Sequence, residues 1–171
     1  MFTKTSLVFF AAIATAFAAP TDSVFNAVAN GSAVQNSDVS ASVGSLWLNH
    51  AQDASCDKEN TNVAAFYIKD GAAFLYAASA TPQQLYIDRS GMGRGKIGYV
   101  TGAEPTPKNA ETTGFAVSDD GKLTFDGEDS FFACPSGDSY AIWKQQFSED
   151  CGAVTIDAKY TDSPVGCSYT Q

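Results

Sequence analysis

The strongest constraint on the fold of this chain is its pattern of short apolar runs. Runs rich in aromatic and β-branched residues recur at roughly ten-residue intervals, separated by Gly, Asp, Asn and Pro. Such spacing is typical of antiparallel strands joined by turns. After residue 18, no segment carries a strong 3.6-residue apolar period. The pattern predicts an all-β fold, with one compact antiparallel domain that is either a barrel or a sandwich.

The Ala-rich stretch 72–80 is the one place where propensity favours a helix. Phe74 and Tyr76 alternate there with smaller residues, and Pro82 follows. Alternation is the period of a strand, so we expect a strand here as well.

A faint internal repeat refines the fold prediction. Three stretches that begin at Phe25, Phe66 and Phe115 each contain a Phe, a β-branched residue and an Asn-Gly or Asp-Gly pair. These pairs are strong hairpin signals, because both turn positions need positive φ. Three hairpin units suit a β-trefoil, and a β-sandwich is the main alternative.

The N-terminus has the pattern of a secretory signal peptide. Lys4 precedes an apolar run, and Ala16 and Ala18 flank Phe17 in an A-x-A cleavage pattern. We expect cleavage after Ala18, which gives a signal peptide at 1–18 and one domain at 19–171. No second apolar run is long enough to span a bilayer, so we expect no membrane partner after cleavage.

The chain is acidic, with 19 Asp and Glu against 10 Lys and Arg and a formal net charge of −9. Loss of Lys4 with the signal makes this about −10. An acidic protein without a basic cluster binds nucleic acid poorly, so we expect no nucleic-acid partner.

Four cysteines on an exported chain predict two disulfides among Cys56, Cys134, Cys151 and Cys167. Three pairings are possible, and we favour Cys151–Cys167 with Cys56–Cys134. With no C-x-x-C pair and a single His, the chain offers no zinc site, and the acidic turns fail EF-hand spacing. We expect no metal and no cofactor. Asn30 begins the one N-x-S/T pattern and is a candidate for N-glycosylation.

The stretch YIDRSGMGRGKIGY matches the G-x-G-x-x-G spacing of a dinucleotide-binding loop. Dinucleotide binding needs a helix after the glycines. Here the residues that follow predict a strand, and two prolines come after it. We therefore interpret the glycines as turn residues. Arg89, Arg94 and Lys96 make this loop locally basic, so it could hold a neighbouring acid in place or form a surface-binding loop.

Hydrolytic chemistry has little support. A Ser-His-Asp site would need His50, the sole His, and no G-x-S-x-G pattern is present. We expect His50 at the surface or in a turn. Paired carboxylates could cleave glycosides, but the acids that could do so lie mostly in predicted turns. These acids are Asp119, Asp120, Asp126, Glu128, Asp129, Glu149 and Asp150.

Aromatic residues are abundant and have two possible roles. Trp47 lies between Leu46 and Leu48, and Trp143 follows Ile142, so we expect both tryptophans to pack in the core. A few tyrosines could instead form an exposed platform for sugar rings.

Several segments resemble the PhiA family of filamentous-fungal cell wall proteins. They are ASCDKEN, FYIKDGAAFLYAASATPQQLYIDRSGMGRGKIGYVTGAEPTPKNAE, FACP and CSYTQ. The stretch from Gly114 to Cys151 also resembles, more faintly, the cysteine-rich end of yeast cell wall proteins with internal repeats. The chain lacks their Gln-containing repeat, which in that family is the glucan-linked portion.

The PhiA resemblance implies a secreted, non-enzymatic protein of the fungal cell wall. The family is associated with phialide and conidium development, includes allergens and has no catalytic residues to transfer. We expect wall polysaccharide (glucan, chitin or mannan) or other wall proteins as partners. The alternatives are a diffusible lectin-like glycan-binding protein or effector, and a secreted hydrolase or hydrolase inhibitor.

Overall fold

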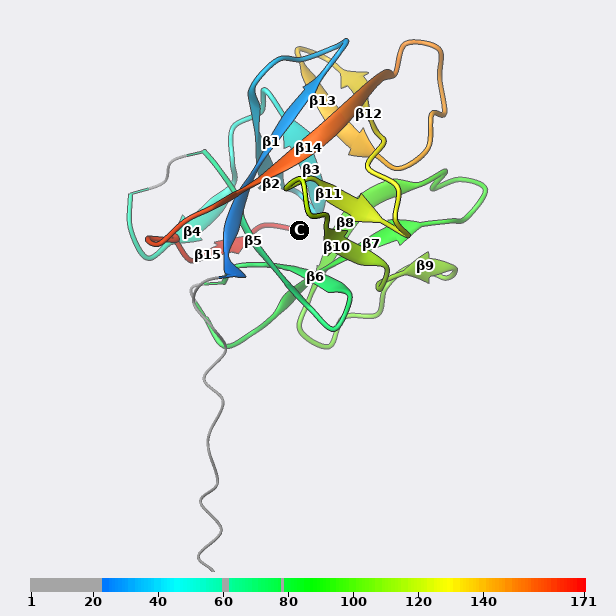
Figure 1. The fold of residues 1–171 in the computed structure, drawn as a ribbon. Coiled ribbons are helices and arrows are strands. Elements are labelled where there is room, and N and C mark those ends of the chain that lie inside the picture. The colour runs from blue at the N-terminus through cyan, green and yellow to red at the C-terminus, as the bar shows by residue number, and fades with distance from the viewer. Residues whose placement is uncertain (1–22, 60–61, 78) are drawn as a thin grey trace, which may run out of the picture.

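The computed structural model describes residues 23–59, 62–77 and 79–171 (Figure 1). The described residues form fifteen strands and no α-helix, which confirms the all-β prediction. They contain no helix of the length and apolarity needed to cross a membrane. The predicted signal peptide, 1–18, lies outside the described residues. The strands are β1 Phe25–Gly31, β2 Ser37–Ser42, β3 Ser45–Leu48, β4 Ala54–Cys56, β5 Ala65–Lys69, β6 Ala72–Leu75, β7 Gln83–Asp88, β8 Lys96–Thr101, β9 Ala110–Glu111, β10 Phe115–Val117, β11 Leu123–Phe125, β12 Phe131–Ser136, β13 Ser139–Trp143, β14 Gly152–Tyr160 and β15 Cys167–Tyr169.

Eleven strands form one large antiparallel sheet in the order β14-β12-β13-β8-β3-β2-β1-β5-β6-β7-β9. Additional pairings join β14 to β1, β13 to β3 and β8 to β7. The pairings therefore form a closed circuit through β1, β2, β3, β13, β12 and β14. The remaining strands make two short pairs, β10–β11 and β4–β15.

The pairing of β1 with β14 places the first strand beside the penultimate strand of the chain (Figure 1). It runs for seven residue pairs, from Phe25↔Tyr160 to Gly31↔Val154. A Cβ atom at Gly31 would lie 2.1 Å from the carbonyl oxygen of Ala153. Gly31 therefore permits a close approach of β14, and Asn30-Gly31 is not the two-residue hairpin turn that the sequence suggested.

The other two repeat turns form as predicted. Asp70 and Gly71, both at positive φ, connect β5 to β6, and the turn that contains Gly121 connects β10 to β11. The first two repeat stretches pair with each other through Phe25↔Phe66, whereas β10–β11 is a separate sheet. The three-fold trefoil repeat is thus not confirmed. The Ala-rich stretch forms β6 over Ala72–Leu75, as the alternation predicted.

Alternating burial along the strands builds the core. In β7, Gln83, Leu85 and Ile87 are buried, while the residues between them are half-buried. Phenylalanines add the largest volumes, and Phe25 stacks on Phe66 with 5.9 Å between ring centroids. Burying each such side chain stabilises the fold by about 1.5–3 kcal/mol.

The prediction that both tryptophans pack in the core is wrong. Trp47 and Trp143 are half-buried and lie outside the core cluster. The cause is the two-residue period of a strand: Leu46, Leu48 and Ile142 point inward, so the residue next to each points outward. Trp143 instead packs on Phe147, with ring centroids 4.3 Å apart.

The four predicted cysteines form two disulfides, but the favoured pairing is wrong. The bonds are Cys56–Cys167 and Cys134–Cys151. Cys56 and Cys167 are register partners in the β4–β15 pair. Cys134 lies in β12, and Cys151 directly precedes β14, which pairs with β12 through Ala133↔Gly152. Strand pairing therefore decides the connectivity.

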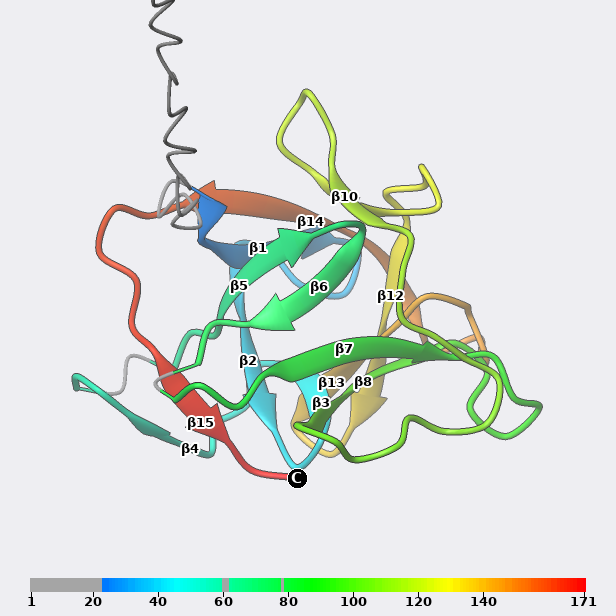
Figure 2. The ribbon, with the colours of Figure 1, turned by 90° about the horizontal axis from the view of Figure 1, so that it is seen from below.

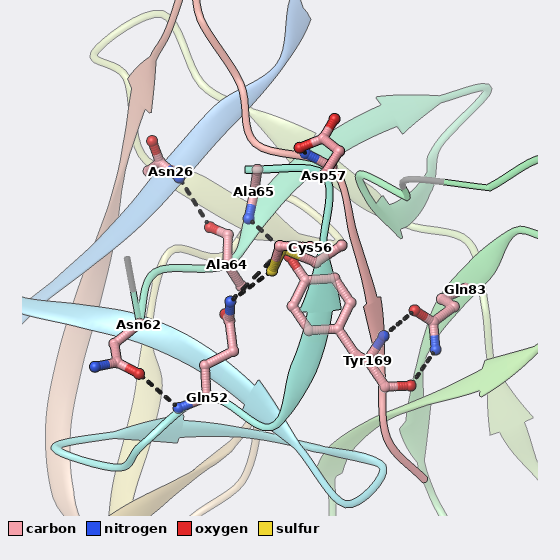
Figure 3. Close-up of a disulfide and its surroundings, with 11 residues drawn as sticks. Asn26, Gln52, Cys56, Asp57, Asn62, Ala64, Ala65, Gln83 and Tyr169 are labelled. Carbon is pink, nitrogen blue, oxygen red and sulfur yellow. Dashed lines mark hydrogen bonds between the residues drawn. A yellow bond between two sulfur atoms is a disulfide. The ribbon is translucent and has the colours of Figure 1, made fainter. Parts of the chain in front are cut away.

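Strand β15 is held by several contacts besides its disulfide (Figure 3). The buried amide of Gln83 donates to the Tyr169 carbonyl and accepts from the Tyr169 N–H, both at 2.8 Å. Gln52 Nε2 lies 3.8 Å from Cys167 Sγ. Tyr99 Oη donates to the Thr170 carbonyl. These contacts fix the last residues of the chain against β7 and β8.

Candidate functional site

The glycine-rich loop between β7 and β8 is a self-contained turn. Arg94 N–H donates to the Ser90 carbonyl at 2.9 Å, and Gly95 N–H donates to the Asp88 carbonyl at 2.7 Å. Gly95 has a φ of +83°, and a Cβ at Gly93 would lie 2.0 Å from the Asp88 carboxyl carbon. Strand β8 follows the loop, without the helix N-terminus that a pyrophosphate would need. The glycines therefore have structural roles.

The three basic residues of this loop have different environments. Arg89 forms an ion pair with Glu111, with 2.7 Å between Nε and Oε2, and its guanidinium lies 5.4 Å from the Phe125 ring centroid. Arg94 is exposed, and its Nε lies 3.3 Å from the Gly91 carbonyl. Lys96 is half-buried. Arg89 thus serves the fold, and Arg94 and Lys96 are the cations that remain for a surface-binding role.

Lys96 lies at the edge of a polar groove of about 350 Å³, together with Tyr86 and Glu104. The Tyr86 side chain packs over Gly98, where an added Cβ would lie 2.6 Å from its hydroxyl oxygen. Burial, followed by the charges of Asp88 and Glu104, raises the pKa of Tyr86. The groove also includes Gly44 of the β2–β3 turn and Gln171, two residues after β15. In Figure 2, the loop between β7 and β8 lies on the opposite side of the molecule from the β4–β15 pair.

A second hollow, of about 450 Å³, is lined by polar side chains around His50. Asn36, Asn49 and Asn62 contribute to it, and all three have positive φ, between 49° and 57°. His50 is exposed, as predicted, and its ring lies 4.8 Å from that of Trp47. This hollow offers amide and imidazole hydrogen-bonding groups at the surface.

His50 also contacts a serine, which bears on the hydrolase alternative. Its Nδ1 lies 3.2 Å from Ser139 Oγ, and Ser139 Oγ donates to the Asn49 carbonyl at 2.9 Å. While its single proton is donated to Asn49, the Ser139 hydroxyl can only accept from the tautomer of His50 that carries the proton on Nδ1. Nucleophile activation requires the opposite direction, with the imidazole accepting the serine proton. The pair is therefore arranged as a structural contact.

Six of the seven acidic turn residues are exposed, and Asp129 is half-buried, as expected for acids in turns. Asp119 and Asp120 are exposed in the β10–β11 turn, and Glu128 forms an ion pair with Lys144 at 3.3 Å. Among the described residues, no group of three or more His, Cys, Asp or Glu could hold a metal ion.

A third hollow, of about 420 Å³, is lined mainly by apolar atoms and contains Tyr67 and Tyr76. Tyr67 stacks on Phe74 across the β5–β6 hairpin, with ring centroids 5.1 Å apart and planes at 15°. Burial raises the pKa of Tyr67. The sequence suggested tyrosine platforms only in general terms. It gave no signal for this pair, because the hollow forms from segments distant in the chain.

Asn30, the candidate glycosylation site, lies near the end of β1. Its side-chain carbonyl accepts a hydrogen bond from the Asn36 N–H at 2.8 Å, and the residue is half-buried. Ser32, which completes the acceptor pattern, is exposed. Glycosylation of Asn30 stays a prediction.

The geometry defines a class of protein: a disulfide-linked, all-β domain with polar and apolar surface hollows. Comparisons with known proteins then specify the family. The model of the PhiA-like secreted protein family matches residues 24–170, and the chain belongs to that family. No solved structure matches it.

Curated relatives cover nearly the whole chain. The cell wall protein phiA of Aspergillus fumigatus is 43% identical, over 94% of this chain and 92% of the relative. The cell wall protein phiA of Aspergillus niger is 40% identical, over 96% and 97%. That of Emericella nidulans is 37% identical, over 98% of each chain. The resemblance to PhiA and the predicted location, secreted to the fungal cell wall, are confirmed.

Proposed function

We propose that this protein is a non-enzymatic component of the fungal cell wall, retained by direct contacts with wall polysaccharide, and that it supports phialide and conidium development. The near-full-length match to relatives named cell wall proteins carries the proposal. Two hollows support direct polysaccharide contact: the one around Tyr67 offers aromatic rings, and the one around His50 offers amide and imidazole hydrogen-bonding groups.

The first experiment is sedimentation of the secreted protein with insoluble β-1,3-glucan, chitin and mannan. We expect it to pellet with at least one polymer and to be released by the matching soluble oligosaccharide. If the protein stays in the supernatant with all three, direct polysaccharide contact is wrong, and another wall protein becomes the partner to seek. Release of reducing sugar during the incubation would contradict the non-enzymatic assignment.

The role of the basic loop is tested separately, by the extent to which walls of living hyphae retain the protein. The variant Arg94→Glu/Lys96→Glu is compared with the charge-matched control Lys58→Glu/Lys159→Glu. If the loop contributes, the loop variant folds normally but is released into the medium more than the control. Equal retention of the two variants would exclude this loop as a wall contact.

The developmental role is tested by deleting the encoding gene and counting phialides and conidia. We expect fewer of both, with recovery when the gene is restored. Normal counts after deletion would refute this part of the proposal without affecting wall retention.

A further inference from the structure

The hollow around Tyr67 and Tyr76, here called the tyrosine hollow, forms where four chain segments meet. They are the residues just before β1, the β5–β6 hairpin, the β6–β7 connection and the β14–β15 connection. The lining residues that carry the argument are Tyr67, Lys69, Tyr76, Ala80, Pro82 and Pro164.

Backbone hydrogen bonds hold these segments in place. Tyr76 N–H donates to the Ala65 carbonyl at 2.7 Å, and the Tyr76 carbonyl accepts from Cys167 N–H at 3.1 Å. The Pro82 carbonyl accepts from Gly102 N–H at 2.8 Å. The Cys56–Cys167 disulfide lies three residues beyond Pro164. The hollow is therefore pre-formed, so binding there orders little of the chain.

The chemistry of the lining selects an uncharged, hydroxyl-rich ligand. Phe74 braces the Tyr67 ring, and prolines and alanines supply further apolar surface. Within the described part of the chain, neither the Tyr67 nor the Tyr76 hydroxyl has a hydrogen-bond partner. Lys69 is the sole charged residue among the described lining residues, although the chain carries 19 Asp and Glu.

We infer that the tyrosine hollow binds a neutral hexopyranose chain of the wall, an inference that rests on the proposed function. The apolar C–H faces of a pyranose ring can pack on the tyrosine rings. Its hydroxyls can both donate to and accept from tyrosine hydroxyls, and they can accept from Lys69. The absence of lining carboxylates disfavours cationic ligands.

A proline-rich peptide is the other ligand that an aromatic and proline-lined hollow could accept. Its backbone carbonyls only accept hydrogen bonds, so it would leave half of the capacity of each tyrosine hydroxyl unused. A saccharide uses both, and the hydroxyl groups therefore favour the saccharide.

The test compares Tyr67→Leu/Tyr76→Leu with the matched control Tyr140→Leu/Tyr160→Leu in the glucan, chitin and mannan sedimentation assay. Both variants lose two tyrosine rings and keep apolar volume. We expect at least about a ten-fold loss of affinity for the tyrosine-hollow variant and little change for the control. Circular dichroism and urea midpoints verify that each variant is folded.

A second measurement needs no variant. Nitration of the wild-type protein with tetranitromethane is followed by mass spectrometry, with and without a saturating hexasaccharide of the polymer that sedimentation identifies. We expect the sugar to protect Tyr67 and Tyr76 and to leave Tyr160, which is 58% exposed, unprotected.

The outcomes separate this inference from the proposed function. If the wild-type protein binds no polymer, the proposed polysaccharide contact fails, and the inference fails with it. If the wild type binds but the tyrosine-hollow variant binds equally well, or the sugar leaves Tyr67 and Tyr76 unprotected, only the site assignment is wrong. Tyrosine-dependent binding of a decaproline peptide, with no sugar protection, would overturn the saccharide assignment in favour of a peptide ligand.

Discussion

The two disulfides should contribute unequally to stability, because they close loops of very different length. Cys56–Cys167 joins residues 111 positions apart, whereas Cys134–Cys151 joins residues 17 positions apart. The loop-entropy relation gives about 5 kcal/mol for the long loop and about 3 kcal/mol for the short one. We therefore expect Cys56→Ala/Cys167→Ala to lower the free energy of unfolding by about 2 kcal/mol more than Cys134→Ala/Cys151→Ala.

The cavity left by each substitution acts against this order. Cys134 and Cys151 are 1% and 4% exposed, whereas Cys56 is only half-buried, so the short-loop variant loses slightly more buried volume. The long-loop variant will therefore be the less stable one only if the difference in loop entropy exceeds the difference in lost packing. This makes the comparison a stringent test of the entropic argument.

The assay is urea unfolding of the secreted protein and both double variants, followed by circular dichroism. With a slope of about 2 kcal/mol per M urea, the long-loop variant should unfold about 1 M below the short-loop variant. Equal midpoints, or a lower midpoint for Cys134→Ala/Cys151→Ala with unchanged slopes, would refute the reasoning.

Four further predictions address single features. Val43 in the β2–β3 turn has a φ of +47°, which is strained for a β-branched residue, and its side chain is 63% exposed. Val43→Asn should therefore raise the free energy of unfolding by about 1 kcal/mol in the urea assay. A lower urea midpoint would contradict the argument from turn strain. Gln83→Leu leaves the buried N–H and carbonyl of Tyr169 unpaired and should lower the free energy of unfolding by about 2–4 kcal/mol in the same assay. An unchanged free energy of unfolding would mean that water replaces the amide. Burial raises the pKa of the Tyr169 hydroxyl from 10.0 to about 12 in the folded state. The stability that the neutral hydroxyl contributes should therefore be fully present below about pH 10 and be lost progressively up to about pH 12. In urea unfolding at a series of pH values, Tyr169→Phe should flatten this part of the stability profile. If Asn30 carries an N-glycan, Ser32→Ala should lower the intact mass of the secreted protein by one glycan, and an unchanged glycan mass would exclude modification there.

Much of the fold could be predicted from local patterns. Asp70-Gly71 and the Gly121 turn formed the expected hairpins, since the positive φ that Asp70, Gly71 and Gly121 adopt is a local requirement. Asn30-Gly31 has the same local signal but lies in β1, because its seven-pair ladder with β14 keeps the backbone extended. That ladder joins segments more than a hundred residues apart, and no local pattern reports it.

The aromatic residues show a different limit. The burial of Leu46 and Leu48 already implies that Trp47 faces outward, so its position could have been predicted from alternation; hydrophobicity alone suggested the core. Tyr67 and Tyr76 could not be assigned in this way. Their hollow also needs Pro82 and Pro164, which only the assembled sheet brings to the same place.

By itself, the sequence determined the strand content, the number of disulfides, the absence of the helix that a dinucleotide loop needs, and the family. Each of these depends on residue type and short-range spacing, which the chain carries wherever it folds. The tertiary structure alone decided which cysteines pair, why Gly31 is a glycine and where the tyrosines form a hollow. Those features depend on contacts between distant segments, and they are set by the pairing of β1 with β14 and of β4 with β15.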